Sequence, residues 1–225
     1  MLNTFPAGMM GRTPRVLFSF SDRSNTWPDL AEVVAPSFTR HDHSGLAEGL
    51  IAGTLVATDL GWQPVEDLQP GDRIVTFDNG LRPLKAVRVS TLYTAATRAP
   101  QGLWPLEVPT GALGNRSAVQ LLPGQPVLIE SDAAETLYGD PFLMVSAGSL
   151  DGYKGIARTA PAAELRIVTL EFADDEVVYA NGTLLVHCPA QQGDTVAEAQ
   201  PGHAPYQHLT DQQARVLVEA MHQHG

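Results

Sequence analysis

Short apolar runs separated by turn residues fill most of the chain, from Gly49 to His187. Glycine, proline, asparagine and aspartate divide these runs at close spacing, which is typical of a β-rich domain. Apolar residues at the three- and four-residue spacing of an amphipathic helix are nearly absent from this part of the chain. We therefore predict an all-β domain over residues 49–188.

The clearest local element is a hairpin around Asp78, Asn79 and Gly80. An Asn-Gly pair adopts positive φ at low steric cost, so it favours a tight turn between two strands. We expect this turn to join a strand at residues 73–77 to a strand at residues 84–89.

Five other runs predict strands. An earlier pair, at residues 53–57 and 62–65, forms a hairpin in which Pro64 lies at an edge or a strand end. Three later runs, at residues 165–172, 176–179 and 183–186, are joined by short polar turns at 173–175 and 181–182. These three runs predict a β-meander.

The two flanks of the domain differ from it in composition. Residues 1–48 are rich in Pro, Ser, Thr, Asp and Asn, with one strand-like run at 16–20, so we expect an irregular N-terminal arm. Residues 189–209 contain Gln, Gly, Asp and Ala together with Pro201, Gly202 and Pro205, which is typical of a linker.

A short helix is predicted at residues 210–225. Thr210 and Gln213 form a capping box at its start, and Ala214, Leu217, Val218 and Met221 fall on one face. An apolar helix face needs a surface to cover it, either on the same domain or on a partner protein. Docking on the chain's own domain is the interpretation we favour.

Composition narrows the function classes. Hydrophobic residues make up 44% of the chain and charged residues 17%, which is ordinary for a folded protein. The formal net charge of -11 repels phosphate backbones, so we exclude nucleic acid as a partner. No apolar run approaches the roughly 20 residues that span a bilayer, so we predict no membrane span.

Cysteine occurs once, at Cys188, so neither an intramolecular disulfide nor a cluster of thiolate metal ligands is possible. The first 20 residues lack the continuous apolar stretch of a secretory signal peptide. The compartment remains unknown, and a cytoplasmic location is the default expectation.

Three segments in order resemble the bacterial branch of the Hedgehog/intein (Hint) domain family. The first contains Gly53-Thr54 and the run Pro-Val-Glu-Asp-Leu-Gln-Pro-Gly-Asp at residues 64–72. The second contains Gly-Ala-Leu-Gly at 111–114 and Leu-Pro-Gly-Gln-Pro-Val-Leu at 122–128. The third is Val-Val-Tyr-Ala-Asn-Gly at 177–182. The resemblance implies a compact Hint fold of two similar, intertwined halves.

The resemblance also implies a chemistry of self-cleavage. In that family a Cys or Ser at the first position of the domain attacks the preceding carbonyl, and a His three residues after a Thr or Ser protonates the departing nitrogen. Here the nucleophile position falls on Gly49, the Thr or Ser position on Leu122, and the two His positions on Gln125 and Asp175. Glycine has no nucleophilic side chain and glutamine does not titrate. We therefore predict a catalytically degenerate site.

The end of the domain leaves an alternative open. His187 and Cys188 stand where inteins end in His-Asn, so the pair is a candidate for residual autoprocessing. Adjacent residues on a strand point to opposite faces, however, and would meet only through a bend. Other candidates are Ser44 as a displaced nucleophile, and His41, Asp42 and His43 with the histidines near the C-terminus as metal ligands; we predict neither a metal site nor a cofactor.

Three functional hypotheses follow. The favoured one is a Hint-type module that has lost its catalysis and acts through binding to a protein partner or as a scaffold. The first alternative is an autoprocessing domain that uses Cys188 or an unrecognised nucleophile. The second is an interaction protein built on the C-terminal helix, in which Gln200 to Gly225 would carry the partner site.

Overall fold

Strands dominate the part of the chain that the structure describes, as the apolar pattern predicted. The computed structural model describes residues 48–93, 100–162, 164–190 and 206–224. The predicted arm therefore lies outside the described residues except for Glu48, as does most of the predicted linker. All described residues belong to one compact unit within residues 40–225. Neither of the two described α-helices is long and apolar enough to cross a membrane.

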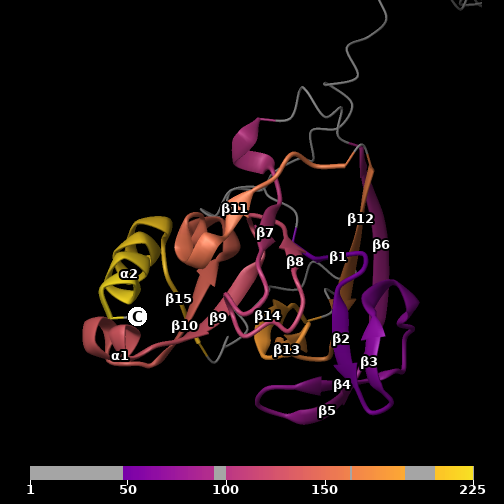
Figure 1. Cartoon of the computed structure of the whole chain (residues 1–225). Coiled ribbons are helices and arrows are strands. Elements are labelled where there is room, and N and C mark those ends of the chain that lie inside the picture. Colours follow the sequence, from indigo (N-terminus) through magenta and orange to yellow (C-terminus); the bar gives the residue numbers. More distant parts are fainter. Residues whose placement is uncertain (1–47, 94–99, 163, 191–205, 225) are drawn as a thin grey trace, which may run out of the picture. The chain divides into compact units, whose positions relative to one another are not determined.

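The described elements follow one another in the order shown in Figure 1. They are β1 (Leu50–Ile51), β2 (Leu55–Thr58), β3 (Gly61–Pro64), β4 (Arg73–Thr76), β5 (Gly80–Pro83), β6 (Ala86–Tyr93), β7 (Leu106–Val108), β8 (Val119–Leu121), β9 (Pro126–Glu130), α1 (Asp132–Tyr138), β10 (Phe142–Ser146), β11 (Ala157–Arg158), β12 (Glu164–Glu171), β13 (Glu176–Ala180), β14 (Leu184–Cys188), β15 (Gln207–His208) and α2 (Asp211–His224). Four short 3-10 turns lie between them, η1 (Val65–Asp67), η2 (Gln101–Leu103), η3 (Ala147–Leu150) and η4 (Tyr153–Gly155).

The strands form two sheets. The first sheet has the order β11-β7-β8-β1-β12-β6, and the second has the order β15-β10-β9-β14-β13-β2-β4-β5 with β3 paired to β2. Nearly all pairs are antiparallel; β15 lies parallel to β10. The predicted fold class, all-β with one short C-terminal helix, is confirmed.

One helix was not predicted. The helix α1 has seven residues, begins where the Ser131 hydroxyl accepts a hydrogen bond from the Ala133 amide, and ends at Gly139 with a φ of 79°. A helix of two turns shows too little of the 3.6-residue period to be recognised from the apolar pattern alone. Its two buried residues, Ala133 and Ala134, are small and so add little to that pattern.

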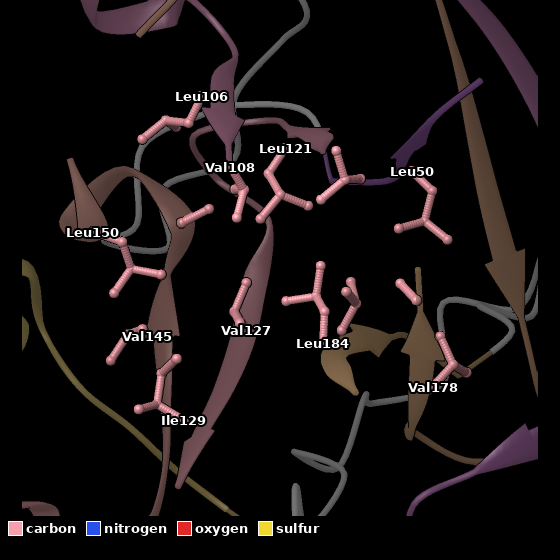
Figure 2. Packing of buried hydrophobic residues seen from close by; sticks show 14 of the residues in the cluster. Leu50, Leu106, Val108, Leu121, Val127, Ile129, Val145, Leu150, Val178 and Leu184 are labelled. Carbon is pink, nitrogen blue, oxygen red and sulfur yellow. The ribbon is translucent and has the colours of Figure 1, made fainter. Parts of the chain in front are cut away.

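Leucine and valine side chains from both sheets build the main core. Figure 2 shows Leu50 and Leu121 of the first sheet beside Val127, Val178 and Leu184 of the second. All five are 2% exposed or less. Removing a large apolar side chain from water stabilises the fold by about 1.5–3 kcal/mol per residue, so this contact holds the two sheets together.

Two predicted strand connections were wrong. The hairpin at Asp78–Gly80 exists, but its return strand is β5, paired to β4 from Thr76 opposite Gly80 to Arg73 opposite Pro83. The segment predicted as the return strand, 84–89, begins β6 instead, which pairs with β12 in the first sheet. Proline lacks an amide hydrogen, so Pro83 suits the end of an edge strand such as β5.

The predicted meander was also wrong in part. β13 and β14 form the expected hairpin through Asn181 and Gly182, but β12 lies in the first sheet and β13 in the second. The turn at 173–175 therefore carries the chain from one sheet to the other. The earlier hairpin is confirmed, because β2 pairs with β3 and Pro64 ends the latter strand.

The C-terminal helix docks on its own domain. The Thr210 hydroxyl accepts from the Gln213 amide, and the Gln213 side chain accepts from the Thr210 amide, so the predicted capping box is present. Ala214, Leu217 and Val218 are buried in the main core, and Figure 1 shows α2 beside α1. Two residues of the predicted linker, Gln207 and His208, form β15.

Candidate functional site

Gln125 connects the first residue of the predicted domain to its last strand. The backbone N–H of Gly49, just before β1, donates to Oε1 of Gln125 at 2.9 Å. Nε2 of the same side chain donates to the carbonyl of His187 in β14 at 2.9 Å and to that of Pro126 at 3.2 Å. Gln125 is 1% exposed. Two positions that lie 76 residues apart, Gly49 and Gln125, are therefore in direct contact.

Side chains from β12 fill the space where a side chain at Gly49 would lie. A Cβ atom built on Gly49 would stand 2.6 Å from Cγ2 of Ile167 and 3.1 Å from Oγ1 of Thr169. The φ of Gly49 is +144°, which residues with a side chain rarely adopt. Any larger residue would therefore strain the backbone and displace Ile167.

Leu122 packs in one apolar cluster with Ile167, the side chain that occupies the space next to Gly49. It is 4% exposed and packs in a small cluster with Ile51, Leu165 and Ile167. A Thr or Ser at this position would offer a hydroxyl, whereas Leu122 offers only carbon. Among the described residues, the side chains around Gly49 are thus aliphatic apart from the Gln125 amide and the Thr169 hydroxyl, which donates to the Glu48 carbonyl at 3.4 Å.

Asp175 holds the segment that leaves the domain. Its Oδ1 accepts a hydrogen bond of 2.7 Å from the amide of Ala190, just beyond β14. Partial removal from water, and then the nearby charge of Asp175, raise the pKa of Glu48 above its ordinary value. Because Glu48 precedes Gly49 and Ala190 follows Cys188, Asp175 lies close to both the entry and the exit of the domain.

His187 is half-buried, and the two nitrogens of its ring are shielded from solvent without a hydrogen bond. Neither Nδ1 nor Nε2 has a partner within the described residues, and the ring lies edge-on to that of His208 at 5.9 Å between centroids. Burial lowers the pKa of His187 below its ordinary value; the Asp175 carboxylate opposes this shift and His208 adds to it. The neutral imidazole is therefore the favoured form at neutral pH.

Cys188 points away from His187 into the main core. Its side chain packs in the cluster that includes Val186 and Leu184, and the residue is 3% exposed. Burial, followed by the charges of Glu48 and Glu176, raises the pKa of Cys188 to about 12. Since a thiolate is the nucleophilic form of cysteine, this thiol is unreactive near neutral pH. The two candidate residues at the end of the domain do not form a pair.

Asn181 links the third motif segment to the first, and Asn115 fixes the loop that follows the Gly-Ala-Leu-Gly run. Asn181, with a φ of 46°, accepts from the Leu55 amide at 2.7 Å through Oδ1 and donates to the Ser117 hydroxyl at 3.0 Å. Asn115 donates to the carbonyls of Val108, Pro109 and Ser117. Sequence analysis missed Asn115, although its place directly after the Gly-Ala-Leu-Gly run was a signal. Both asparagines are buried, so the motifs support structure as well as any chemistry.

Comparison with known proteins decides the family. The family model described as "Hint domain" matches residues 49–185, which is more than half of the chain. The chain belongs to the Hint domain family. The match begins at Gly49, the residue whose amide donates a hydrogen bond to Gln125.

Solved structures similar to this Hint domain include three with intein or intein-like titles. The bacterial intein-like domain from Clostridium thermocellum has 14% identity and a TM-score of 0.41, over 63% of this chain and 99% of that one. The gp41-1 intein has 13% identity and a TM-score of 0.39, over 64% and 99%. The MchDnaB-1 intein has 14% identity and a TM-score of 0.36, over 61% and 98%. No curated protein matches the sequence.

Of the remaining candidates that the structure describes, His208 lies against His187 and His222 lies on α2. Among the residues that the structure describes, no group of three or more His, Cys, Asp or Glu side chains is arranged to hold a metal ion. His41, Asp42, His43 and Ser44 lie outside the described residues. His222 contacts the Tyr153 ring at 5.1 Å between centroids, which places it on α2 and away from His187.

Replacing Gln125 with leucine tests the importance of this bridge for the Hint fold. The Gln125→Leu variant removes the acceptor of the Gly49 amide and the donor to the His187 carbonyl, and an unsatisfied buried polar group costs about 1–3 kcal/mol. We expect the free energy of unfolding in urea to fall by roughly 2–4 kcal/mol. The matched variant Gln120→Leu, on β8, is expected to change it by less than about 0.5 kcal/mol. Equal effects at the two positions would show that the bridge contributes nothing special.

Proposed function

We propose that this Hint domain does not process its own chain and works instead as a binding or scaffold module. The observation that carries the proposal is the environment of Gly49. Its amide is held by a glutamine, and Cγ2 of Ile167 stands 2.6 Å from the place that a Cβ would occupy. The position of the expected nucleophile is thus both without a side chain and already filled.

The chemistry of the other positions supports the same proposal. An acyl shift needs a side-chain atom with a lone pair to attack the carbonyl, and a titratable group to protonate the leaving nitrogen. Gln125 contacts that nitrogen but accepts its hydrogen and has no proton to transfer. Asp175 is engaged with the Ala190 amide, and Leu122 is packed among aliphatic side chains.

Autoprocessing through Cys188 finds no support in the geometry. A thiol with a pKa of about 12 that faces the main core has neither the ionisation nor the access that a nucleophile needs. His187, the adjacent candidate base, lies on the other face of β14. We therefore keep a single proposed function.

A scaffold role is supported by the way in which the chain enters and leaves the domain. The Thr169 hydroxyl donates to the Glu48 carbonyl, and Asp175 binds the Ala190 amide while its charge acts on Glu48. The Gln125 side chain bridges Gly49 and His187 at the same place. The domain thereby holds Glu48 and Ala190, the described residues at its two ends, through the same few side chains.

Intact mass spectrometry of the purified chain tests the proposal. We expect an unchanged full-length mass over days between pH 5 and pH 9, with and without hydroxylamine or a thiol reductant, because neither Gly49 nor the buried Cys188 supplies the nucleophile that forms the ester or thioester. Fragments with the masses of residues 1–48 and 49–225 would overturn the proposal. Breakage that disappears in the Cys188→Ser variant would instead establish autoprocessing through that residue.

A further inference from the structure

An open cavity of about 440 Å³ lies beside β9, β13 and β14 of the second sheet, and part of its lining, including Ile129 and Leu184, belongs to the main core. Its volume falls within the range of about 300–1,000 Å³ that ligand sites occupy. The loop Gly111–Gly114 forms one wall, and Tyr153 with Lys154 forms another. The floor is partly aromatic and aliphatic, with Phe77, Leu128, Tyr179 and Leu185. Nothing in the proposed scaffold role uses this cavity.

The floor of the cavity continues into a second, smaller apolar cluster. Leu128 stands opposite Met144 on one side and opposite Leu185 on the other, and Leu185 stands opposite Tyr179. Residues that stand opposite one another in paired strands share a face of the sheet. Leu128, Met144 and Leu185 are buried, while Phe77 and Tyr179 pack against them half-buried. One apolar face thus runs from the cavity to the edge of the sheet at β10.

The chain's own C-terminal segment already covers the β10 end of this face. The strand β15 runs parallel to β10, with Gln207 opposite Leu143 and His208 opposite Met144. The ring of Tyr206 lies 6.4 Å from that of Phe77 and 6.3 Å from that of Phe142, and its hydroxyl donates to Asp78 at 2.6 Å. An extended segment that carries an aromatic side chain is therefore the kind of occupant that this face accepts.

We infer that the cavity is a docking site for a second extended polypeptide segment that carries an aromatic side chain. The inference rests on the proposed binding role and names the class of partner. It follows from the continuity of the cavity floor with the surface under Tyr206, because Phe77 belongs to both. Offset and edge-on contacts with Phe77 and Tyr179 would hold the incoming ring, as Phe77 and Phe142 hold Tyr206.

The walls of the cavity indicate the charge of the occupant. Lys154 lines the cavity, and its ammonium group lies 5.2 Å from the centre of the Tyr153 ring, a cation–π contact that favours this position. Glu130 also lines the cavity and carries the opposite charge. A segment of little net charge around its aromatic residue fits such a pair of walls better than a strongly acidic or basic one.

An NMR titration of the full-length chain tests the inference. The probe is the peptide acetyl-Tyr-Gln-His-Leu-Thr-amide, which repeats the sequence of residues 206–210. We expect saturable shifts of the amide signals of residues 111–114 and 183–185. The Tyr179→Ser variant is expected to bind about fivefold to tenfold more weakly, since it removes one ring of the floor. The matched variant Trp62→Ser, at an exposed ring on β3, is expected to bind as the unchanged chain does.

Four results would overturn the inference. These are the absence of saturable shifts, equal shifts with a peptide in which Ala replaces Tyr, equal affinity for N-acetyltyrosinamide, and shifts that depend on protein concentration without peptide. The third would make the cavity a small-molecule site, and the fourth would make a second copy its occupant. Each outcome is independent of the mass of the chain, so failure here is distinguishable from failure of the proposed function.

Discussion

Replacing Gly182 with alanine is expected to destabilise the domain by roughly 3–5 kcal/mol, a large share of the about 5–15 kcal/mol by which folded domains are usually stable. Gly182 has a φ of +134°, a region that only glycine occupies without strain. A Cβ at this position would stand 2.8 Å from the carbonyl oxygen of Gly114 and 3.0 Å from the amide nitrogen of Arg116. Both are backbone atoms and cannot rotate away, so the variant combines dihedral strain with a steric clash.

The clash would also break the contact between two motif segments. Around Gly182, the Arg116 amide donates to the Asn181 carbonyl at 2.6 Å and the Thr183 amide donates to the Gly114 carbonyl at 3.1 Å. Separating the segments to make room for a methyl group would therefore cost these hydrogen bonds as well.

Urea unfolding followed by circular dichroism measures this effect, with Gly53→Ala as the matched control. Gly53 also has positive φ, +92°, but a Cβ there meets nothing within 4 Å. We expect the free energy of unfolding of the control to fall by about 1–2 kcal/mol, because the substitution adds backbone strain without a steric clash. If the two variants lost the same stability, close packing at Gly182 would have no energetic role.

The strands could be predicted from the sequence better than their partners could. Alternating and continuous apolar runs report whether a segment is extended, and they located β4, β12 and β13 to within a few residues. They do not report which sheet a strand joins. β12 and β13 are neighbours in the chain, yet β12 pairs with β6 and β1 while β13 pairs with β14, β2 and β4. Except for β14, which follows β13 directly, those partners lie tens of residues away, where local patterns carry no information.

The candidate site was predictable where it depends on motifs and unpredictable where it depends on packing. The motif spacing singled out Gly49 and Gln125, and the structure places the amide of one on the side chain of the other. Nothing in the sequence linked Ile167 or Thr169 to Gly49, because β12 reaches β1 through the long-range antiparallel pairing of Leu50 with Val168 and of Ile51 with Ile167. The role of Ile167 in filling the site is a tertiary property.

In the C-terminal segment, too, the local feature could be predicted from the sequence and the long-range pairing could not. The capping box at Thr210 and Gln213 is a local hydrogen-bond pattern, so the start of α2 could be predicted closely. The strand β15 has only two residues, and it exists because the edge of β10 offers unpaired backbone groups to it. A composition typical of a linker gave no sign of that pairing.

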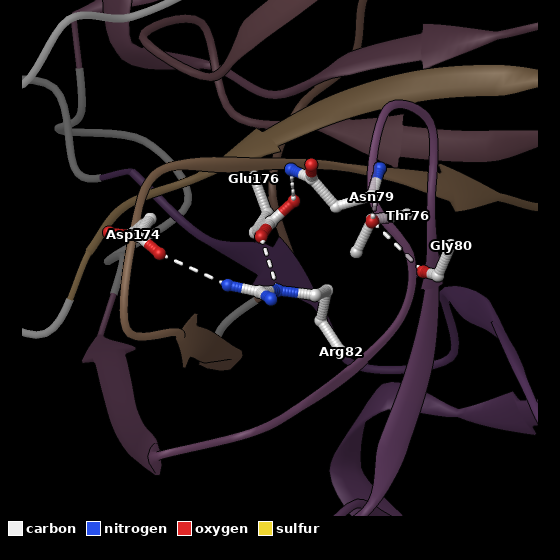
Figure 3. Close-up of polar contacts among 6 residues, drawn as sticks. All are labelled: Thr76, Asn79, Gly80, Arg82, Asp174 and Glu176. Carbon is white, nitrogen blue, oxygen red and sulfur yellow. Dashed lines mark hydrogen bonds and ion pairs between the residues drawn. The ribbon is translucent and has the colours of Figure 1, made fainter.

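A second large loss of stability is expected when Arg82 is replaced, because its guanidinium group is the counterion of the buried Glu176 carboxylate. Nε of Arg82 lies 2.9 Å from Oε1 of Glu176, whose side chain is 1% exposed, and Nδ2 of Asn79 donates to Oε2 at 2.9 Å, as Figure 3 shows. The Arg82→Met variant keeps the aliphatic part of the side chain and removes the charge. Among the described side chains, Asn79 would then remain as the hydrogen-bond donor to the buried Glu176 carboxylate.

We expect Arg82→Met to lower the free energy of unfolding at pH 7 by roughly 2–4 kcal/mol, because breaking a buried ion pair leaves a charge without its counterion. Asn79 and the partial exposure of Arg82 keep the loss from being larger. The control Asp174→Ala removes the other carboxylate of Arg82, which is 75% exposed, and should cost less than about 0.5 kcal/mol. The double variant Arg82→Met/Glu176→Leu is expected to regain much of the loss, since it removes the stranded charge. A double variant less stable than Arg82→Met alone would mean that the cost comes from packing of the arginine and not from the carboxylate beneath it.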